Sequence, residues 1–154
     1  MPHHDIKALK PKKNSRYTQG YVNPAECKKL FESQKSKPII YRSSWEYYFI
    51  KWCEGNPAIR YWGSECVPIS YILCTDNTQH IYYPDYIIEF MSGETWLVEI
   101  KPLSQTKKPK SKDYNSPAWK TYIKNRCKWK AANEFAKQNN LKFKIITENT
   151  INKL

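Results

Sequence analysis

The pattern of apolar and polar residues predicts regular secondary structure from about residue 43 onward. In residues 43–55, apolar side chains recur at i, i+4, i+7 and i+8, which places them on one face of a helix. Ser43 followed three positions later by Glu46 forms a capping box, and the Gly-Asn-Pro sequence at 55–57 ends the helix. The apolar side chains on this face are Trp45, Phe49, Trp52 and Cys53.

Three strand patterns follow this helix, over residues 66–73, 80–90 and 95–101. The first alternates with a period of two, and the other two are rich in β-branched and aromatic residues. Polar turns at 75–78 and 91–94 separate them. We expect the second and third strands to form a hairpin.

A second, longer helix is predicted after a basic loop at 103–116. Ser116 is its cap and Pro117 its first residue, and a last strand follows at 141–147. The order α-β-β-β-α-β predicts an α/β (α+β) fold in which helices flank a mixed sheet. The helix residues expected to be buried are Tyr122, Ile123, Trp129, Ala132, Phe135 and Ala136.

Residues 1–37 lack such periodicity, because they are polar, rich in lysine and interrupted by prolines. We expect a basic N-terminal arm here, extended except for one short helix over 24–31 that Asn23 caps and Pro24 begins. The folded domain is then expected to comprise residues 38–154.

Charge is distributed unevenly along the 154 residues, whose formal net charge is +12. Residues 1–40 contain nine Lys and Arg against three Asp and Glu, and residues 101–154 contain fourteen against three. Between them, residues 41–100 contain three against eight. This distribution suggests basic ends that hold a polyanion while central carboxylates act on it.

The cysteines and the apolar runs exclude several classes of protein. Five cysteines without a Cys-x-x-Cys pair predict free thiols in a reducing compartment rather than disulfides or a zinc site. Any metal must then be held by oxygen ligands. No apolar run reaches the roughly 20 residues of a membrane span, and the N-terminus lacks the apolar stretch of a secretory signal.

Two carboxylates and a lysine interrupt the otherwise apolar strands of the expected hairpin. Asp85 follows a proline on one strand, and Glu99 and Lys101 are two apart on the next, so the latter two share a face. Mg²⁺ prefers carboxylate oxygens and can activate water to attack a phosphodiester. The lysine can orient that water or offset charge on the phosphorus.

The register of the hairpin decides whether these side chains can meet. A two-residue loop at Ser92 and Gly93 would place Asp85 opposite Ile100, on the wrong face for Glu99. A three-residue loop, or a bulge near Pro84, is therefore required.

A structural interpretation stays open for each of these residues. Asp85 can simply end a strand, and Glu99 and Lys101 can form an ion pair on a solvated face. Glu46 can be only the carboxylate of the capping box, or it can add an acidic group to a metal site.

Five segments of the chain resemble the PD-(D/E)xK nucleases, and more closely the head-completion nucleases of large contractile-tailed bacteriophages. Pro84-Asp85 and the later Glu99-Ile100-Lys101 match the superfamily motif, and the element order matches its core. The series covers about residues 38–147. Its segments are IYRSSWE at 40–46, WGSE at 62–65, YYPDY at 82–86, VEIKP at 98–102 and KWKAA at 128–132.

This resemblance implies a Mg²⁺-dependent DNA nuclease, with Mn²⁺ able to substitute, that trims packaged DNA before a tail joins the filled head. Asp85 and Glu99 would be metal ligands, Lys101 the catalytic lysine, and Glu46 the acidic residue that completes the site. Expected partners are double-stranded DNA and capsid, portal or neck proteins. The expected location is the host cytoplasm during assembly, or the virion itself.

Basic residues expected to contact the DNA backbone lie in three places. Arg42 precedes Glu46 by one helical turn, although capping or surface pairing explains it equally well. The lysines of the loop and of a helical ridge are the other two groups, and a solvated charged face is their alternative. They are Lys107, Lys108, Lys110 and Lys112 in the loop and Lys120, Lys124 and Lys128 on the helix. Glu65 lies in a matching segment without a derived role.

Three other functions remain open at this stage. The chain could be a transposon-end endonuclease or a junction resolvase of the same superfamily. It could also be a head–tail connector that binds DNA without cutting it, although such a protein would usually lose one of Asp85, Glu99 and Lys101.

Overall fold

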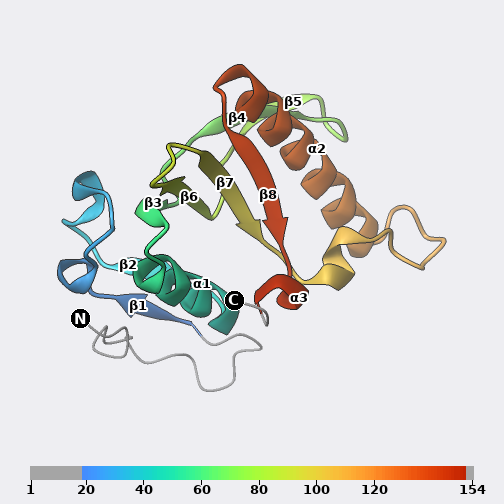
Figure 1. Cartoon of the computed structure of the whole chain (residues 1–154). Coiled ribbons are helices and arrows are strands. Elements are labelled where there is room, and N and C mark those ends of the chain that lie inside the picture. Colours follow the sequence, from blue (N-terminus) through green and yellow to red (C-terminus); the bar gives the residue numbers. More distant parts are fainter. Residues whose placement is uncertain (1–18, 152–154) are drawn as a thin grey trace.

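A mixed sheet of four strands crosses the centre of the molecule in the computed structural model, which describes residues 19–151 (Figure 1). The first two neighbouring pairs of strands are antiparallel and the last pair is parallel. The expected mixed sheet flanked by helices is therefore confirmed. Across the sheet, the strands are β3 (Ile59–Ser64), β6 (Tyr86–Phe90), β7 (Thr95–Ile100) and β8 (Lys142–Ile146).

Two small antiparallel sheets complete the β structure. One pairs β1 (Gly20–Val22) with β2 (Ile39–Tyr41). The other pairs β4 (Ile69–Leu73) with β5 (Thr78–Tyr82) across the expected turn.

The strand expected over residues 80–90 is divided between two sheets. It breaks at Tyr83-Pro84-Asp85, where β5 of the small sheet ends and β6 of the central sheet begins. Proline has no N–H to donate to a strand ladder, which favours the break at this point. The prediction also omitted β3, because its sequence IRYWGS does not alternate regularly even though Ile59 and Trp62 are buried.

Both long helices begin at the predicted caps, and α1 also ends where the sequence predicts. In α1 (Ser44–Gly55), the Ser43 hydroxyl accepts a hydrogen bond from the Glu46 N–H at 3.2 Å. In α2 (Pro117–Gln138), the Ser116 hydroxyl accepts one from the Trp119 N–H at 3.4 Å. The remaining helical segments are short: α3 (Glu148–Ile151) and 3-10 turns at Pro24–Glu26, Glu32–Gln34 and Leu103–Thr106.

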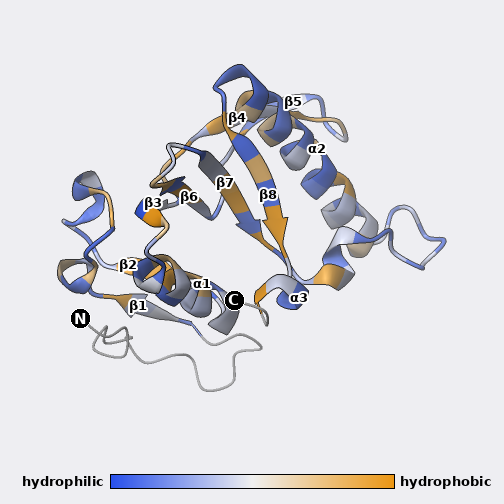
Figure 2. Ribbon diagram, viewed as in Figure 1, coloured by the Kyte–Doolittle hydropathy of each residue, from blue (hydrophilic) through white to orange (hydrophobic). Residues whose placement is uncertain are grey.

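The two long helices cover opposite faces of the central sheet. Phe49 of α1 packs against Tyr86, with ring centroids 4.9 Å apart, in a cluster that includes Val98. Trp129 of α2 packs in a second cluster with Leu97. Since Val98 and Leu97 are neighbours on β7, alternate residues of that strand serve the two cores. Along β8, by contrast, hydrophilic and hydrophobic residues alternate (Figure 2).

Residues 20–37 belong to the folded unit rather than to an extended arm. Val22, Cys27 and Leu30 are almost completely buried in the α1 core. The carboxylate of Glu54 accepts hydrogen bonds from the backbone N–H groups of Lys28 and Lys29 and from the Trp62 indole at 2.7–3.0 Å. The expected helix over 24–31 is a single 3-10 turn. Residues 1–18 of the expected arm lie outside the described residues.

The five cysteines are all free thiols, as the sequence predicts. Cys27 and Cys53 are buried, whereas the Sγ atoms of Cys74 and Cys127 lie 2.9 Å apart near the surface. Within residues 19–151, no helix is both long enough and apolar enough to cross a bilayer.

Candidate active site

The hairpin register brings Asp85 beside Glu99. Tyr86 pairs with Val98 and Glu89 with Thr95, so three residues, 91–93, form the loop. Gly93 adopts a φ of +92°, a conformation that glycine tolerates readily. The first of the two required arrangements, a three-residue loop, is thus confirmed. At the start of β6, Asp85 Oδ2 accepts a hydrogen bond from the Ile100 N–H at 2.7 Å.

Glu99 is buried at the end of β7, and its two carboxylate oxygens face different partners. Oε1 accepts a hydrogen bond from the Tyr82 hydroxyl at 2.6 Å. Oε2 lies 3.6 Å from the Nζ of Lys101. The ion-pair alternative is therefore right about the contact but wrong about its setting, since only 7% of the Glu99 side chain is exposed and the pair does not lie on a solvated face.

Two cavities meet at Asp85 and Lys101. The larger, of about 470 Å³, contains Glu99 and lies between the β4–β5 hairpin and α2. The smaller, of about 280 Å³, contains Glu46 and lies at the start of α1. Glu46 and Glu99, which lie near the two ends of the acidic segment at residues 41–100, are thus brought to adjoining cavities. The larger cavity is lined by Glu65, Ile81, Tyr82, Tyr83, Asp85, Glu99, Lys101 and Lys128.

Burial and the neighbouring carboxylates hold the proton of Asp85 more tightly than usual. Burial raises the pKa of Asp85 well above its ordinary value, and the negative charges of Glu99 and Glu46 raise it further. The Ile100 N–H and the Lys101 ammonium act in the opposite direction. A cation placed among these groups would offset their mutual repulsion.

Glu46 is placed for both of the roles that the sequence left open, the helix cap and the acidic site. Its backbone N–H and one carboxylate oxygen each contact the Ser43 hydroxyl, at 3.2 and 3.3 Å, as part of the helix cap. Its side chain also lines the smaller cavity beside Asp85 and Lys101. Burial raises the pKa of Glu46, while the Arg42 backbone N–H and the Ser43 hydroxyl lower it.

The expected lysine ridge on α2 is not uniform. Lys120 and Lys124 are exposed, whereas Lys128 is half-buried and lines the larger cavity. The Lys128 ammonium lies 5.3 Å from the centre of the Tyr82 ring. Burial, followed by the nearby Lys124, lowers the pKa of Lys128.

Arg42 forms a surface ion pair with Glu65, which is one of the alternatives that the sequence left open. Glu65 has a φ of +48°, and its N–H donates to the backbone oxygen of Asp85 at 3.0 Å. The pair therefore joins the start of α1 to the strand break. Glu65 lines the larger cavity, a position that sequence reasoning could not assign.

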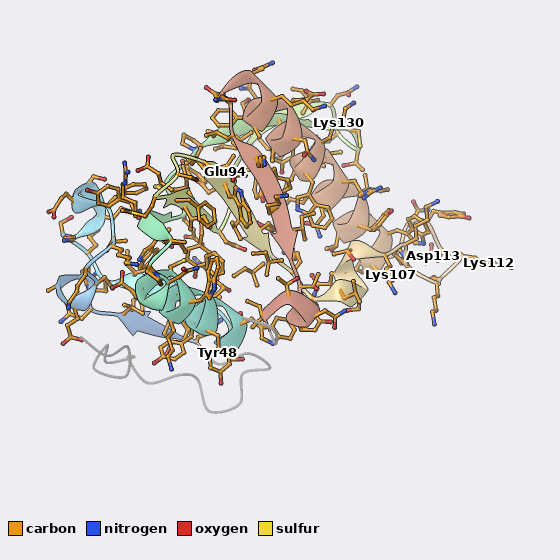
Figure 3. All side chains as sticks on the ribbon, in the orientation of Figure 1. Tyr48, Glu94, Lys107, Lys112, Asp113 and Lys130 are labelled. Carbon is orange, nitrogen blue, oxygen red and sulfur yellow. The ribbon has the colours of Figure 1, made fainter. Side chains whose placement is uncertain are left out.

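The four loop lysines are exposed and lie away from the cavities. Figure 3 shows Lys107 and Lys112 on the segment that projects beside the start of α2. The aromatic rings of Tyr114 and Trp119, with centroids 5.0 Å apart, join the loop to the helix, and the Trp119 indole donates to Ser111 O at 2.7 Å. The loop is thus anchored at its C-terminal end.

Sequence reasoning missed Tyr82. Its position in the predicted strand at 80–90 does not indicate a contact with Glu99, because the strand break that turns the hairpin toward β7 is a tertiary feature. Burial and the adjacent Glu99 carboxylate raise the pKa of Tyr82, so its hydroxyl stays protonated and donates.

The donor set suits a cation that needs few protein ligands. Within residues 19–151, no group of three or more His, Cys, Asp and Glu side chains is close enough to form a complete metal centre. Mg²⁺ commonly uses one or two carboxylates and keeps water or substrate oxygens in its other positions. The buried Tyr86 hydroxyl has no hydrogen-bond partner among the described residues. Burial raises the pKa of Tyr86, and the charges of Glu46 and Asp85 raise it further. These groups fit a hydrated ion.

The mixed sheet, with Asp85, Glu99 and Lys101 together at one end of its two central strands, has the arrangement of a PD-(D/E)xK nuclease domain. The family model described as TnsA-like endonuclease N terminal matches residues 56–148. The chain is also 35% identical over 126 residues to the Head completion nuclease of Enterobacteria phage T4. The aligned region covers 77% of this chain and 84% of that protein. The chain therefore belongs to the TnsA-like endonuclease family and is a relative of the head completion nucleases.

Proposed function

We propose that this protein is a Mg²⁺-dependent deoxyribonuclease that hydrolyses phosphodiester bonds. The observation that carries the proposal is the burial of Glu99 beside Asp85 and Lys101 in one open cavity. Burying carboxylates together is unfavourable unless something compensates their charge. An arrangement that is unfavourable for stability and open to solvent is typical of a functional site.

Each residue of the site has a distinct role in this proposal. Asp85 and Glu99 hold the ion, and Glu46 adds negative charge from the adjoining cavity. Bound Mg²⁺, or Mn²⁺ in its place, supplies an activated water nucleophile and offsets phosphate charge. Lys101, held at 3.6 Å from Glu99, donates to the phosphate oxygens on which charge develops.

Double-stranded DNA is the proposed substrate because basic residues flank the cavity. Lys128 lies inside it, and exposed Lys120 and Lys124 continue along α2 toward the loop. Phosphate contacts of this kind hold a duplex without reading its bases. Arg42 joins this surface when DNA displaces its ion pair with Glu65.

Virion assembly is the proposed setting, and it rests on the relative's name. A nuclease with this role would trim packaged DNA so that a tail can join the filled head. Its partners would then be capsid, portal or neck proteins, and it would act in the host cytoplasm or travel with the virion.

A transposon-end endonuclease is the second candidate, because the matching family model is TnsA-like. A junction resolvase is a further alternative within the superfamily. Comparing cleavage of linear duplex, transposon-end duplex and four-way junctions at equal concentration separates these functions. Preference for linear duplex supports head completion, whereas preference for either of the other substrates supports the alternative.

Plasmid nicking tests the enzymatic proposal. The purified protein should nick supercoiled plasmid in Mg²⁺ or Mn²⁺ and stop when a chelator is in excess. Full activity in chelator would contradict the metal requirement. DNA binding without nicking in either metal would support the non-catalytic connector.

The Lys101→Ala variant tests the division of roles. It should bind Mn²⁺ at least as tightly as the parent, since a nearby positive charge is removed, and yet lose cleavage by roughly 100-fold or more. Calorimetric titration with Mn²⁺ and a single-turnover nicking assay measure the two effects. Loss of metal binding with cleavage would show that Lys101 supports the site structurally.

A further inference from the structure

Tyr82 connects the β4–β5 hairpin to the candidate active site through its hydroxyl. The residue ends β5, and 4% of it is exposed. Its hydroxyl donates to Glu99 Oε1 at 2.6 Å, the only side chain–side chain hydrogen bond that the described residues provide to that carboxylate. A hydrogen bond to an ionised acceptor at this distance is short and strong.

This hydrogen bond determines which way the Glu99 carboxylate faces. With Oε1 engaged by Tyr82, Oε2 remains on the side of Lys101, at 3.6 Å from its Nζ. A carboxylate without this donor would be free to rotate about its terminal torsion, which is a broad and weakly restricted angle.

The Tyr82 ring is itself held from two directions. It packs with Leu97 and Trp129 in the core beneath α2. The Lys128 ammonium also lies 5.3 Å from the ring centre, within the range of a cation–π contact. Contacts from α2 and from the core beneath it therefore hold the ring that carries the donor hydroxyl.

We infer that Tyr82 is a positioning residue that orients Glu99 as a metal ligand. This inference rests on the proposed function and goes beyond it by naming the group that prepares the ligand. Partners that hold a ligating carboxylate by a hydrogen bond typically change metal affinity or activity by 10- to 100-fold when they are removed.

The Tyr82→Phe variant tests the inference, because it removes the hydroxyl and keeps the ring. Titration of the full chain with Mn²⁺ alone, followed by calorimetry, should give a dissociation constant roughly 10- to 100-fold higher than that of the parent. Nicking should weaken at low Mn²⁺ and return to at least half the parent rate at saturating Mn²⁺. Unchanged Mn²⁺ affinity would overturn the inference.

Tyr71→Phe is the matched control on the same hairpin. Tyr71 is equally buried and stacks on His80, but it contacts neither Glu99 nor the larger cavity. Its Mn²⁺ dissociation constant should stay within about twofold of the parent value, well short of the 10- to 100-fold change expected when the partner of a ligating carboxylate is removed. An equal loss in Tyr71→Phe would show that any hairpin substitution weakens the site and would overturn the specific role of Tyr82.

A second pair of variants keeps the test decisive if Tyr82→Phe folds poorly. Replacing both partners of a buried hydrogen bond with apolar groups avoids an unpaired group, so Glu99→Leu is compared with the Glu99→Leu, Tyr82→Phe double variant. If Tyr82 acts through Glu99, the two should bind Mn²⁺ equally. A further loss in the double variant would overturn the inference. Absence of Mn²⁺ binding by the parent would instead overturn the proposed function together with it.

Discussion

Asp85 occupies a position where folding and metal binding have opposite electrostatic requirements. Its Oδ2 is tied to the Ile100 N–H at 2.7 Å, while the charges of Glu99 and Glu46 act against its ionised form. The sequence predicted that these residues would come together, because the motif was readable and set the hairpin register that the site requires. It did not predict Tyr82 or Glu65, since their contacts depend on a strand break and a left-handed backbone position.

Replacing Asp85 with Asn should separate activity from stability. The variant keeps the shape of the side chain and the acceptor for Ile100, but removes one of the crowded negative charges. Nicking should fall by at least 100-fold, and the metal-free protein should unfold at the same or a slightly higher temperature. Asp76→Asn, at the exposed hairpin turn, is the control and should nick at the parent rate. Parent-like nicking by Asp85→Asn would place the site elsewhere.

The raised pKa of Asp85 also predicts how stability depends on pH. Because the folded state holds this proton more tightly than the unfolded state, the group contributes stability below its unfolded pKa, near 3.8. That contribution is lost as pH rises through the higher folded pKa. Urea unfolding of the metal-free parent should therefore show a fall over this window that is smaller in Asp85→Asn. A fall of equal size in both proteins would contradict this assignment.

Individual elements were predicted well where their signals are local. Both long helices begin at Ser caps that the sequence shows, and β7 and β8 follow their apolar runs. The failures have tertiary causes: β3 lacks a regular alternation, and the run at 80–90 changes sheets at Pro84. Local pattern describes an element but not the partner with which it pairs.

The start of α1 allows the capping and site roles of Glu46 to be separated. Ser43→Ala removes the cap and should cost about 1 kcal/mol of unfolding free energy, with nicking at saturating Mg²⁺ largely retained. Glu46→Gln keeps the backbone N–H contact with Ser43 but removes the charge, so nicking should fall by roughly 10-fold or more with little loss of stability. Urea unfolding and plasmid nicking measure both. Loss of stability alone in Glu46→Gln would make it a capping residue only.

The basic loop after β7 can be tested through the salt dependence of DNA binding. Replacing Lys107, Lys108, Lys110 and Lys112 together with Ala should weaken duplex binding and flatten the log–log salt slope by roughly 0.9 for each lost contact. Mn²⁺ affinity should not change. Lys137→Ala, at the far end of α2, is the control and should keep the parent slope. An unchanged slope in the loop variant would indicate that its lysines are only solvated.

Across the whole molecule, the segment at residues 20–37 is joined to the nuclease core by buried groups. Leu30 bridges to Trp62 of β3, and the Glu54 carboxylate receives three donors from the segment and the sheet. The composition of this segment predicted an arm because its few apolar residues are spaced irregularly. Its buried positions become evident only when α1 and β3 are in place.

Replacing Glu54 with Ala should therefore destabilise the whole domain. Three donors lose their acceptor; the exposed Lys28 N–H can bond to water instead, whereas the Lys29 N–H and the Trp62 indole are partly buried. An unsatisfied buried donor costs about 1–3 kcal/mol, so unfolding free energy should fall by roughly 2–4 kcal/mol in a single transition. Urea unfolding followed by tryptophan fluorescence measures this. Glu134→Ala, exposed on α2, should change stability by less than about 0.5 kcal/mol. Equal effects of the two substitutions would mean that the segment contributes little to cooperative folding.

The adjacent thiols of Cys74 and Cys127 have a topological consequence. Their sulfurs are 2.9 Å apart, although the residues are 53 positions apart in the chain. A covalent link between them would close a ring containing Asp85, Glu99 and Lys101. In the chain-entropy account, a ring of this size would restrict the unfolded chain by about 4 kcal/mol. Oxidising or reducing conditions during purification would then determine whether the chain contains this internal disulfide ring. The difference would be visible as a change in mobility on a non-reducing gel.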